Sequence, residues 1–242
     1  MPCFALAIEI SNPAAADASD PASLPGVAAS RVDTDGALSG PIDREPLRSE
    51  GYRDNDLLPA ISRLTARMCA APHDLAWIGV STGPGGFTGI RVGIATAQSI
   101  AQSLDIPVRA VPSGAVAAAT ARTRAGWDRV AVLLATKRET AWVEVFELCD
   151  GPLAPVRVGL VSPRELSELE VDAVLSDPAL REGRFADAWA DACAGRWQPL
   201  RLDPASCLAE ASRRPALRPG GVRPLYAREP EAVTKWRELH GR

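Results

Sequence analysis

The residues with the clearest chemical potential in this sequence are the glycines that follow Ser81. Residues 81–97 read Ser-Thr-Gly-Pro-Gly-Gly-Phe-Thr-Gly-Ile-Arg-Val-Gly-Ile-Ala-Thr-Ala. A glycine-rich turn between a strand and a helix leaves backbone N–H groups free at a helix N-terminus, and these groups favour a bound phosphate. Thr88 is predicted to cap this helix. The residues expected in such a phosphate site are Glu9, Ser11, Gly85, Gly86 and Thr88.

Two common phosphate-binding motifs do not fit this turn. A Walker loop ends in Lys followed by Ser or Thr, whereas here Gly89 is followed by Ile90 and Arg91. A dinucleotide fingerprint needs Gly or Ala at the position that Thr88 occupies. We therefore favour a structural turn over nucleotide binding, and both interpretations remain open at this point.

The helix after the turn carries a face of very small residues. Its members are spaced four apart, so they lie on one side of the helix: Gly89, Gly93, Ala97 and Ala101. Glycine inside a helix costs about 1 kcal/mol relative to alanine, so a close contact is expected to compensate. That contact is either this chain's own sheet or a helix of a partner protein, and the spacing does not choose between them.

The elements that would position these residues are typical of an α/β protein. Residues 4–10 alternate large apolar side chains with small or charged ones, which is the period of a strand. A helix is predicted from Asp56, its cap, because four apolar residues recur there on one face: Leu57, Ile61, Leu64 and Met68. Further strands are predicted at 27–32, 77–81, from 107, at 130–135 and at 142–148, with a second helix at 88–104.

This order predicts two lobes, residues 1–108 and 109–242, with a terminal helix that packs back on the first lobe. Residues 14–26 and 33–55 show no periodicity and are expected to be loops. Gly220 and Gly221, flanked by prolines, indicate a turn rather than a second phosphate loop.

Composition narrows the class of protein. The 242 residues carry a net charge of −3, so this chain lacks the positive field expected of a protein that binds nucleic acid by itself. The five cysteines form no close pair, which predicts buried thiols rather than a zinc site or disulfides. No segment is long and apolar enough to cross a bilayer, and we expect a cytoplasmic protein.

Catalytic residues are scarce. His73 and His240 are the two histidines and lack the spacing of metal ligands, so we expect both at the surface. The serines lie in no Gly-x-Ser-x-Gly elbow, which makes a hydrolase a poor fit.

The run Gly-Pro-Gly-Gly-Phe-Thr-Gly-Ile-Arg-Val-Gly at 83–93 resembles the Gly-Pro-Gly-Ser-Phe-Thr-Gly-Leu-Arg-Ile-Gly signature of the TsaB (YeaZ) family. The opening Leu-Ala-Ile-Glu-Ile-Ser at 6–11 is similar to the family's Leu-Ala-Ile-Asp-Thr-Ser. Residues 224–230 resemble its Pro-x-Tyr-x-Arg ending. The resemblance therefore covers nearly the whole chain, and its glycine-rich part is the most specific.

This resemblance implies a two-lobed actin-like fold and a non-catalytic subunit that binds a TsaD-like enzyme. TsaD-like subunits transfer threonylcarbamoyl to an adenosine of tRNA, and a TsaE-like ATPase belongs to the same assembly. The resemblance places the partner interface on the first two helices, which favours the partner interpretation of the small-residue face. It implies tRNA contact through the complex, no cofactor for this chain, and ATP with magnesium only in the assembly; a homodimer is left open.

The resemblance also indicates what is missing. TsaD-like subunits bind a metal through Asn-His-x-x-x-His, and the corresponding positions here hold Pro112, Ser113 and Ala117. Glu9 lies where actin-like ATPases position metal and phosphate, although a structural hydrogen-bonding role is favoured. A nucleotide-binding phosphotransferase and a glycoprotease-like peptidase remain the alternatives.

Overall fold

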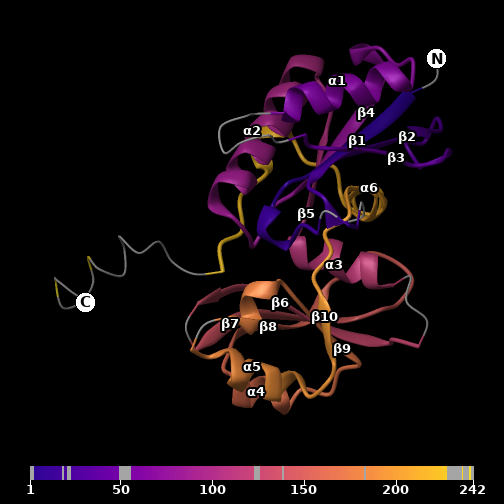
Figure 1. Ribbon diagram of the computed structural model, residues 1–242. Coiled ribbons are helices and arrows are strands. Elements are labelled where there is room, and N and C mark those ends of the chain that lie inside the picture. Colours follow the sequence, from indigo (N-terminus) through magenta and orange to yellow (C-terminus); the bar gives the residue numbers. More distant parts are fainter. Residues whose placement is uncertain are drawn as a thin grey trace.

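The computed structural model describes residues 3–17, 19–20, 23–48, 56–122, 126–137, 139–182, 184–227, 236 and 240. They form two lobes, each built on a five-stranded sheet flanked by helices (Figure 1). The predicted terminal helix lies outside the described residues except for Trp236 and His240. Both sheets are mixed and helices flank them, so the predicted α/β class is confirmed.

The first lobe contains a sheet with the order β3-β2-β1-β4-β5. Strand β1 is parallel to β4 and antiparallel to β2. Helices α1 (Leu57–Arg67) and α2 (Phe87–Leu104) cover one face. The strands are β1 (Cys3–Glu9), β2 (Gly26–Val32), β3 (Asp43–Pro46), β4 (Leu75–Ser81) and β5 (Val108–Val111).

The alternating side chains of β1 pack against different helices on the two faces of the sheet. Leu6 and Ile8 belong to the core under α1 and α2, whereas Ala5 and Ala7 face α6 (Pro204–Ser212) on the other side of the sheet. Small residues on this second face let α6 come close, because side chains on the two faces of a strand alternate. The first sheet is thus covered on one side by a helix from the far end of the chain.

The second lobe contains a sheet with the order β10-β9-β6-β7-β8. Helices α4 (Pro163–Ser167) and α5 (Ala186–Cys193) cover one face, and α3 (Ser113–Ala121) covers part of the other. The strands are β6 (Arg129–Lys137), β7 (Thr140–Glu147), β8 (Pro155–Val161), β9 (Ala173–Ser176) and β10 (Trp197–Pro199).

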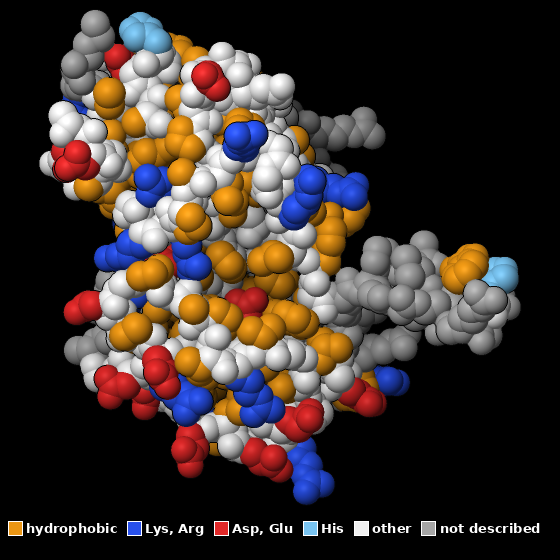
Figure 2. Space-filling model, turned by 180° about the vertical axis from the view of Figure 1, so that it is seen from behind, with side chains coloured by type: hydrophobic (Ala, Val, Ile, Leu, Met, Phe, Trp, Pro, Cys, Tyr) orange, Lys and Arg blue, Asp and Glu red, His pale blue; other side chains and the backbone are white. Residues whose placement is uncertain are grey.

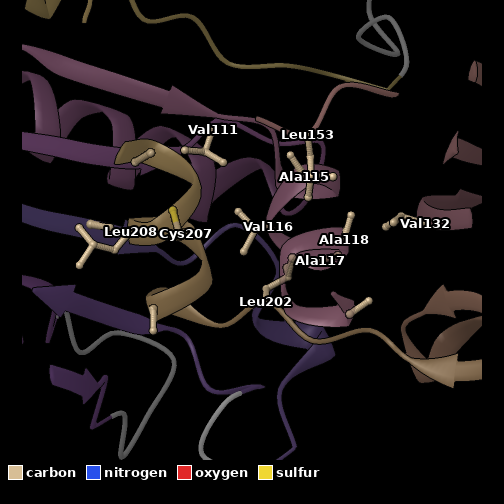
Figure 3. Close-up of a cluster of buried hydrophobic side chains, with 14 of the residues drawn as sticks. Val111, Ala115, Val116, Ala117, Ala118, Val132, Leu153, Leu202, Cys207 and Leu208 are labelled. Carbon is tan, nitrogen blue, oxygen red and sulfur yellow. The ribbon is translucent and has the colours of Figure 1, made fainter. Parts of the chain in front are cut away.

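Helices α3 and α6 join the lobes through a shared apolar core. Val116 of α3 and Leu208 of α6 lie in one buried cluster with Val132 of the second sheet and Val111 of the first (Figure 3). Seven of the nine residues of α3 are buried. Because α3 is apolar nearly all round, it forms the core between the two sheets rather than a surface helix.

Four local predictions are corrected. Strand β3 forms within 33–55, where a loop is expected. Asp56 does not cap α1 with its side chain, which instead pairs with Arg63. Helix α2 begins at Phe87 with Gly86 as its cap residue, so Thr88 is inside the helix. Two cysteines predicted to be buried are exposed, namely Cys69 and Cys149.

Short 3₁₀ turns complete the described chain, and the predicted turn near Gly220 is confirmed as one of them. They are Pro13–Ala15, Pro72–Asp74, Pro178–Arg181 and Pro219–Gly221. Both histidines are exposed, as predicted. Among the described residues, none of the helices combines the length and the apolar character that a membrane span needs.

Candidate functional site

The glycine-rich turn connects β4 to α2 and packs against the end of β1. The Gly86 N–H donates a 2.6 Å hydrogen bond to the Ser11 carbonyl oxygen. A Cβ atom at Gly85 would overlap the same oxygen, so only glycine fits there. The Ser113 N–H donates to the Gly83 carbonyl, which ties the turn to the start of α3. The glycines therefore have a packing role. The Ser11 carbonyl oxygen lies against the turn at the position where a bound anion would need hydrogen-bond donors.

The small-residue face of α2 is covered by this chain's own first sheet. A Cβ atom at Gly89 would overlap the Ile10 carbonyl oxygen, and one at Gly93 would lie 3.3 Å from Ile10 Cγ1. Ala97 and Ala101 have no exposed surface. The interpretation of this face as an open ridge for a partner helix is therefore wrong, because β1 and the residues after it fill the space.

The predicted apolar stripe of α1 also faces inward. Leu57 and Leu64 are buried, and Ile61 and Met68 are half-buried against the same core under α1 and α2. The stripe thus supports the first lobe itself. Only the opposite side of α1, where Leu58 is 58% exposed, is open to another molecule.

Glu9 is buried where the end of β1 meets the start of α3. Its Oε1 atom accepts hydrogen bonds of 2.8 Å from the Ser11 N–H and 2.7 Å from the Ser11 hydroxyl. The Ser113 hydroxyl donates in turn to the Ser11 hydroxyl at 2.8 Å. Burial raises the pKa of Glu9 to about 7, against the opposing effect of hydrogen bonds from Ser11. The Oε1 atom is thus committed to Ser11, whereas the buried Oε2 atom has no hydrogen-bond partner among the described residues.

A second buried acid, Glu144 of β7, meets the same helix from the other lobe. Its Oε1 atom accepts a 3.0 Å hydrogen bond from Trp142 Nε1. A Cβ atom at Gly114 would overlap its Oε2 atom, so glycine in the first turn of α3 makes room for the carboxyl group. Burial raises the pKa of Glu144. Two acids, one from each lobe, therefore bracket the start of α3, and sequence reasoning missed the second because it lies within an apolar strand.

The described residues do not fit the metal site of a TsaD-like subunit. Ser113 is fully buried and bonded to Ser11, and Ala117 is 1% exposed within the core between the lobes. Neither side chain supplies the imidazole that such a site uses. Within the part of the chain that the structure describes, no three His, Cys, Asp or Glu side chains are grouped to hold a metal ion.

The exposed end of α2 carries an aromatic and cationic cluster that was not among the residues predicted from the sequence. The guanidinium of Arg91 lies 4.1 Å from the centre of the Phe87 ring, and its Nε donates a 3.1 Å hydrogen bond to the Tyr226 hydroxyl. The Phe87 and Tyr226 rings stack at 5.8 Å between centres. Phe87 is 57% exposed and Tyr226 is 39% exposed. We call Phe87, Arg91, Leu225 and Tyr226 the α2 cluster.

A weak sequence signal could have found part of this cluster. Phe87 and Arg91 are four residues apart, so they share a helix face, and that face differs from the one that carries Gly89 and Gly93. Tyr226 could not have been placed beside them, because it lies 135 residues from Arg91 in the chain.

Comparison with known structures places this architecture among actin-like folds. An uncharacterized protein from Pseudomonas aeruginosa with similarity to the peptidase YEAZ superposes with a TM-score of 0.66 and 19% identity, covering 93% of this chain and all of that one. YeaZ from the same organism gives a TM-score of 0.65 and 18% identity over 93% and 99%. The predicted two-lobed actin-like fold is thereby confirmed.

Sequence comparison identifies the family. The family model described as TsaD, tRNA N6-adenosine threonylcarbamoyltransferase, matches residues 51–155. The tRNA threonylcarbamoyladenosine biosynthesis protein TsaB of Bacillus subtilis (strain 168) is 45% identical over 65 residues, which span 27% of this chain and 28% of that protein. An uncharacterized protein of Mycobacterium tuberculosis (strain H37Rv) is 30% identical over 177 residues, 73% of this chain and 75% of that one. This chain belongs to the TsaB (YeaZ) family.

Proposed function

We propose that this chain is a non-catalytic subunit in the formation of N6-threonylcarbamoyladenosine in tRNA, and that its α2 cluster binds a TsaD-like catalytic subunit. The biosynthetic role follows from family membership, because relatives in Bacillus and Buchnera carry that function in their names. The partner, the absence of catalysis and the cytoplasmic location are parts of the proposal.

The exposed α2 cluster is the observation that carries the partner proposal. Tyrosine and arginine are enriched among the residues that dominate binding energy at protein interfaces. Here the Phe87 and Tyr226 rings stack on each other, and Arg91 lies over the Phe87 ring and donates to the Tyr226 hydroxyl, so little side-chain freedom remains to be lost on binding. Leu58 on α1 and Leu225 add exposed apolar surface. This cluster replaces the inward-facing residues as the contact expected of the first two helices.

The remaining parts of the proposal rest on charge and on the missing ligand set. A net charge of −3 leaves tRNA binding to the assembled complex. ATP and magnesium belong there too, together with a TsaE-like ATPase. When the catalytic subunit is absent, the α2 cluster of a second copy is the alternative occupant of the same surface.

Affinity measurements with the TsaD-like protein of the same genome test the interface. Phe87→Ala should weaken binding about 30-fold, which corresponds to about 2 kcal/mol for the loss of a central aromatic contact. The Tm of the isolated chain should stay within about 2 °C, because Phe87 is largely exposed.

Charge reversal provides a matched control. Arg91→Glu should weaken binding, whereas Arg164→Glu on α4, where the side chain is 90% exposed, should leave it unchanged. Unaltered affinity of the Phe87→Ala, Arg91→Glu double variant would refute the proposed surface. Calorimetry with ATP and magnesium tests the phosphotransferase alternative, and a saturable heat from this chain alone would support it.

A further inference from the structure

A pocket of about 240 Å³ lies between the two lobes, beside the C-terminal end of α3. The first lobe contributes β3 to its wall, and the second lobe contributes β9 and β10. The segment from β10 to α6 forms a further part of the wall, and Figure 1 shows this segment passing α3 on its way to the first lobe. We call this space the inter-lobe pocket. Its polar lining includes Arg44, Trp127, Gln198, Arg201, Asp203 and Ser206.

The boundary between the lobes changes in character from one side of the molecule to the other. Figure 2 shows the boundary from behind, with hydrophobic side chains across its middle and Lys and Arg side chains on its left. In Figure 1, turned by 180°, this is the side on which β3 lies. Cationic groups therefore border the lobes on the side where Arg44 lines the pocket.

The apolar part of the wall suits a single ring. Ala117 and Ala121 of α3 and Leu175 of β9 line the pocket with buried side chains. Trp127 adds an indole that is partly buried against the core between the lobes. Pockets for drug-sized ligands begin at about 300 Å³. At about 240 Å³, the inter-lobe pocket therefore fits a smaller molecule, such as one ring with a polar substituent.

Several hydrogen-bond donors on the wall lack partners among the described residues. Arg44 holds Asp203 through Nε and Nη2, at 2.8 Å each, while its Nη1 atom makes no hydrogen bond to a described residue. The same holds for Trp127 Nε1, the Gln198 amide and the Ser206 hydroxyl. A ligand that carries several acceptor atoms satisfies such a set of donors.

Arg201 adds a second guanidinium group to the wall. Its Nε atom lies 2.7 Å from Asp20 Oδ2, and 34% of its side chain stays exposed. A guanidinium group presents its donors in a planar fork that matches the oxygen atoms of a carboxylate or a phosphate. Two such groups on one wall therefore favour an oxyanion over a neutral acceptor.

The carboxylate on the wall is already occupied. Asp203 is 5% exposed, and its Oδ1 atom accepts a 2.9 Å hydrogen bond from the Ala205 N–H in addition to the bond from Arg44. Asp203 is the N-cap residue of α6, so the helix fixes its position, and Asp203 in turn orients Arg44. The guanidinium group is thus held in place before a ligand arrives, which lowers the entropic cost of binding.

We propose that the inter-lobe pocket binds a small organic anion, namely a carboxylate or a phosphate monoester carried on a single apolar ring. The oxyanion accepts hydrogen bonds from Arg44 and Arg201, and the ring packs against Trp127 and Leu175. Because the wall comes from both lobes, the bound anion connects them. The site is independent of the proposed TsaD-like partner, since it uses no residue of the α2 cluster.

Calorimetric titration of the full chain with phenyl phosphate and with benzoate tests the proposal. At least one of these probes should bind saturably with a Kd below about 1 mM, and the tighter one identifies the preferred oxyanion. Benzyl alcohol keeps the ring without the charge, and inorganic phosphate keeps the charge without the ring. Each should bind at least about tenfold more weakly than phenyl phosphate or benzoate, because each loses one of the two kinds of contact.

Two variants alter the pocket in different ways. Arg201→Gln removes a charge and should weaken binding about tenfold. Ser206→Leu keeps every charge but fills the space, so it should abolish binding. Arg164→Gln on α4 is the matched control, because this side chain is 90% exposed and outside the pocket, and its affinity should equal that of the parent. Circular dichroism of each variant checks that the chain is folded, and one folded pocket variant is sufficient to decide.

The thermal transition of the full chain gives a second readout. A ligand that binds only the folded chain stabilises it by mass action, so the preferred probe should raise the Tm of the parent but not that of Ser206→Leu. Absence of saturable binding by both probes at about 10 mM overturns the proposal. Equal affinity for inorganic phosphate or for benzyl alcohol also overturns it, as does undiminished binding by a folded Ser206→Leu chain.

Discussion

Helix α2 presents two contrasting surfaces. Its inner face carries glycine and alanine beside the buried Ile90 and Ile94, and it lies against the end of β1, where the Cβ of any other residue at Gly89 would overlap the Ile10 carbonyl oxygen. Its outer end holds Phe87 and Arg91, large side chains that remain exposed. Small residues at helical spacing therefore indicate that something approaches closely, but they do not reveal whether that neighbour belongs to the same chain. Exposed large residues are the better guide to a partner.

A methyl group added at Gly89 tests the inner surface of α2 and should destabilise the chain strongly. Gly89→Ala should lower the free energy of unfolding by about 3 kcal/mol, because the added methyl group meets a backbone carbonyl that cannot rotate away. Chemical denaturation of the isolated chain measures this loss. Gly220→Ala is the matched control, since nothing lies within 4 Å of its Cβ position, and its effect should be below about 0.5 kcal/mol.

Gly93→Leu gives a related result with a different readout. Leucine at this position would collide with Ile10 and Ile8, so we expect loss of folded protein rather than a soluble chain that has lost its partner. Circular dichroism and size-exclusion chromatography of the isolated chain check this. A folded, monodisperse Gly93→Leu chain would restore the idea that this face is open.

The next effect concerns Glu9, beneath the same end of α2. Its folded pKa of about 7 exceeds the ordinary value of 4.5, so the folded state binds more protons between these pH values. The contribution of Glu9 to the free energy of unfolding is fully present below pH 4.5 and is lost as the pH rises through 7. The loss amounts to up to about 3 kcal/mol at about 1.4 kcal/mol per pKa unit.

Glu9→Gln should remove this pH dependence. The amide still accepts from Ser11 but carries no proton to release, so the variant should gain stability relative to the parent as the pH rises from 5 to 8. Urea denaturation at several pH values measures the difference. A constant difference across this range would show that Glu9 titrates at an ordinary pKa.

A milder substitution tests the outer surface of α2. Tyr226→Phe removes the exposed hydrogen bond from Arg91 while keeping the ring stacked on Phe87. Stability should change by less than about 0.5 kcal/mol, because exposed hydrogen bonds contribute little net free energy. Affinity for the TsaD-like protein should fall about threefold if the hydroxyl fixes Arg91 for binding, and calorimetric titration would detect this.

Much of the fold was predictable because its signals are local. The alternation of β1, the stripe of α1 and the glycine-rich turn each depend on nearby residues, and all three elements occur where the sequence places them. Strand β3 was not predictable, because the residues that stabilise it are distant in sequence. Glu45 of β3 forms ion pairs with Arg63 and Arg67 of α1.

The candidate site was predictable only in part, for the same physical reason. Periodicity identifies which residues share a face, but the element that covers the face is set by tertiary packing. Gly93 and Ala97 were correctly predicted to share a helix face, but that face was assigned to a partner helix instead of this chain's own first sheet. Tyr226 joins Phe87 only because the chain returns along α2, where Gln98 donates to the Val222 carbonyl.

Helix α6 has a consequence for the order in which this molecule can be completed. It covers Ala5 and Ala7 of β1 and approaches Gly79 of β4, yet it follows the strands of both sheets in the sequence and is synthesised after them. During translation, the first five strands therefore emerge with one apolar face of their sheet uncovered. This face stays uncovered until residue 212 has left the ribosome. The nascent amino-terminal half should consequently engage chaperones throughout the synthesis of the second lobe.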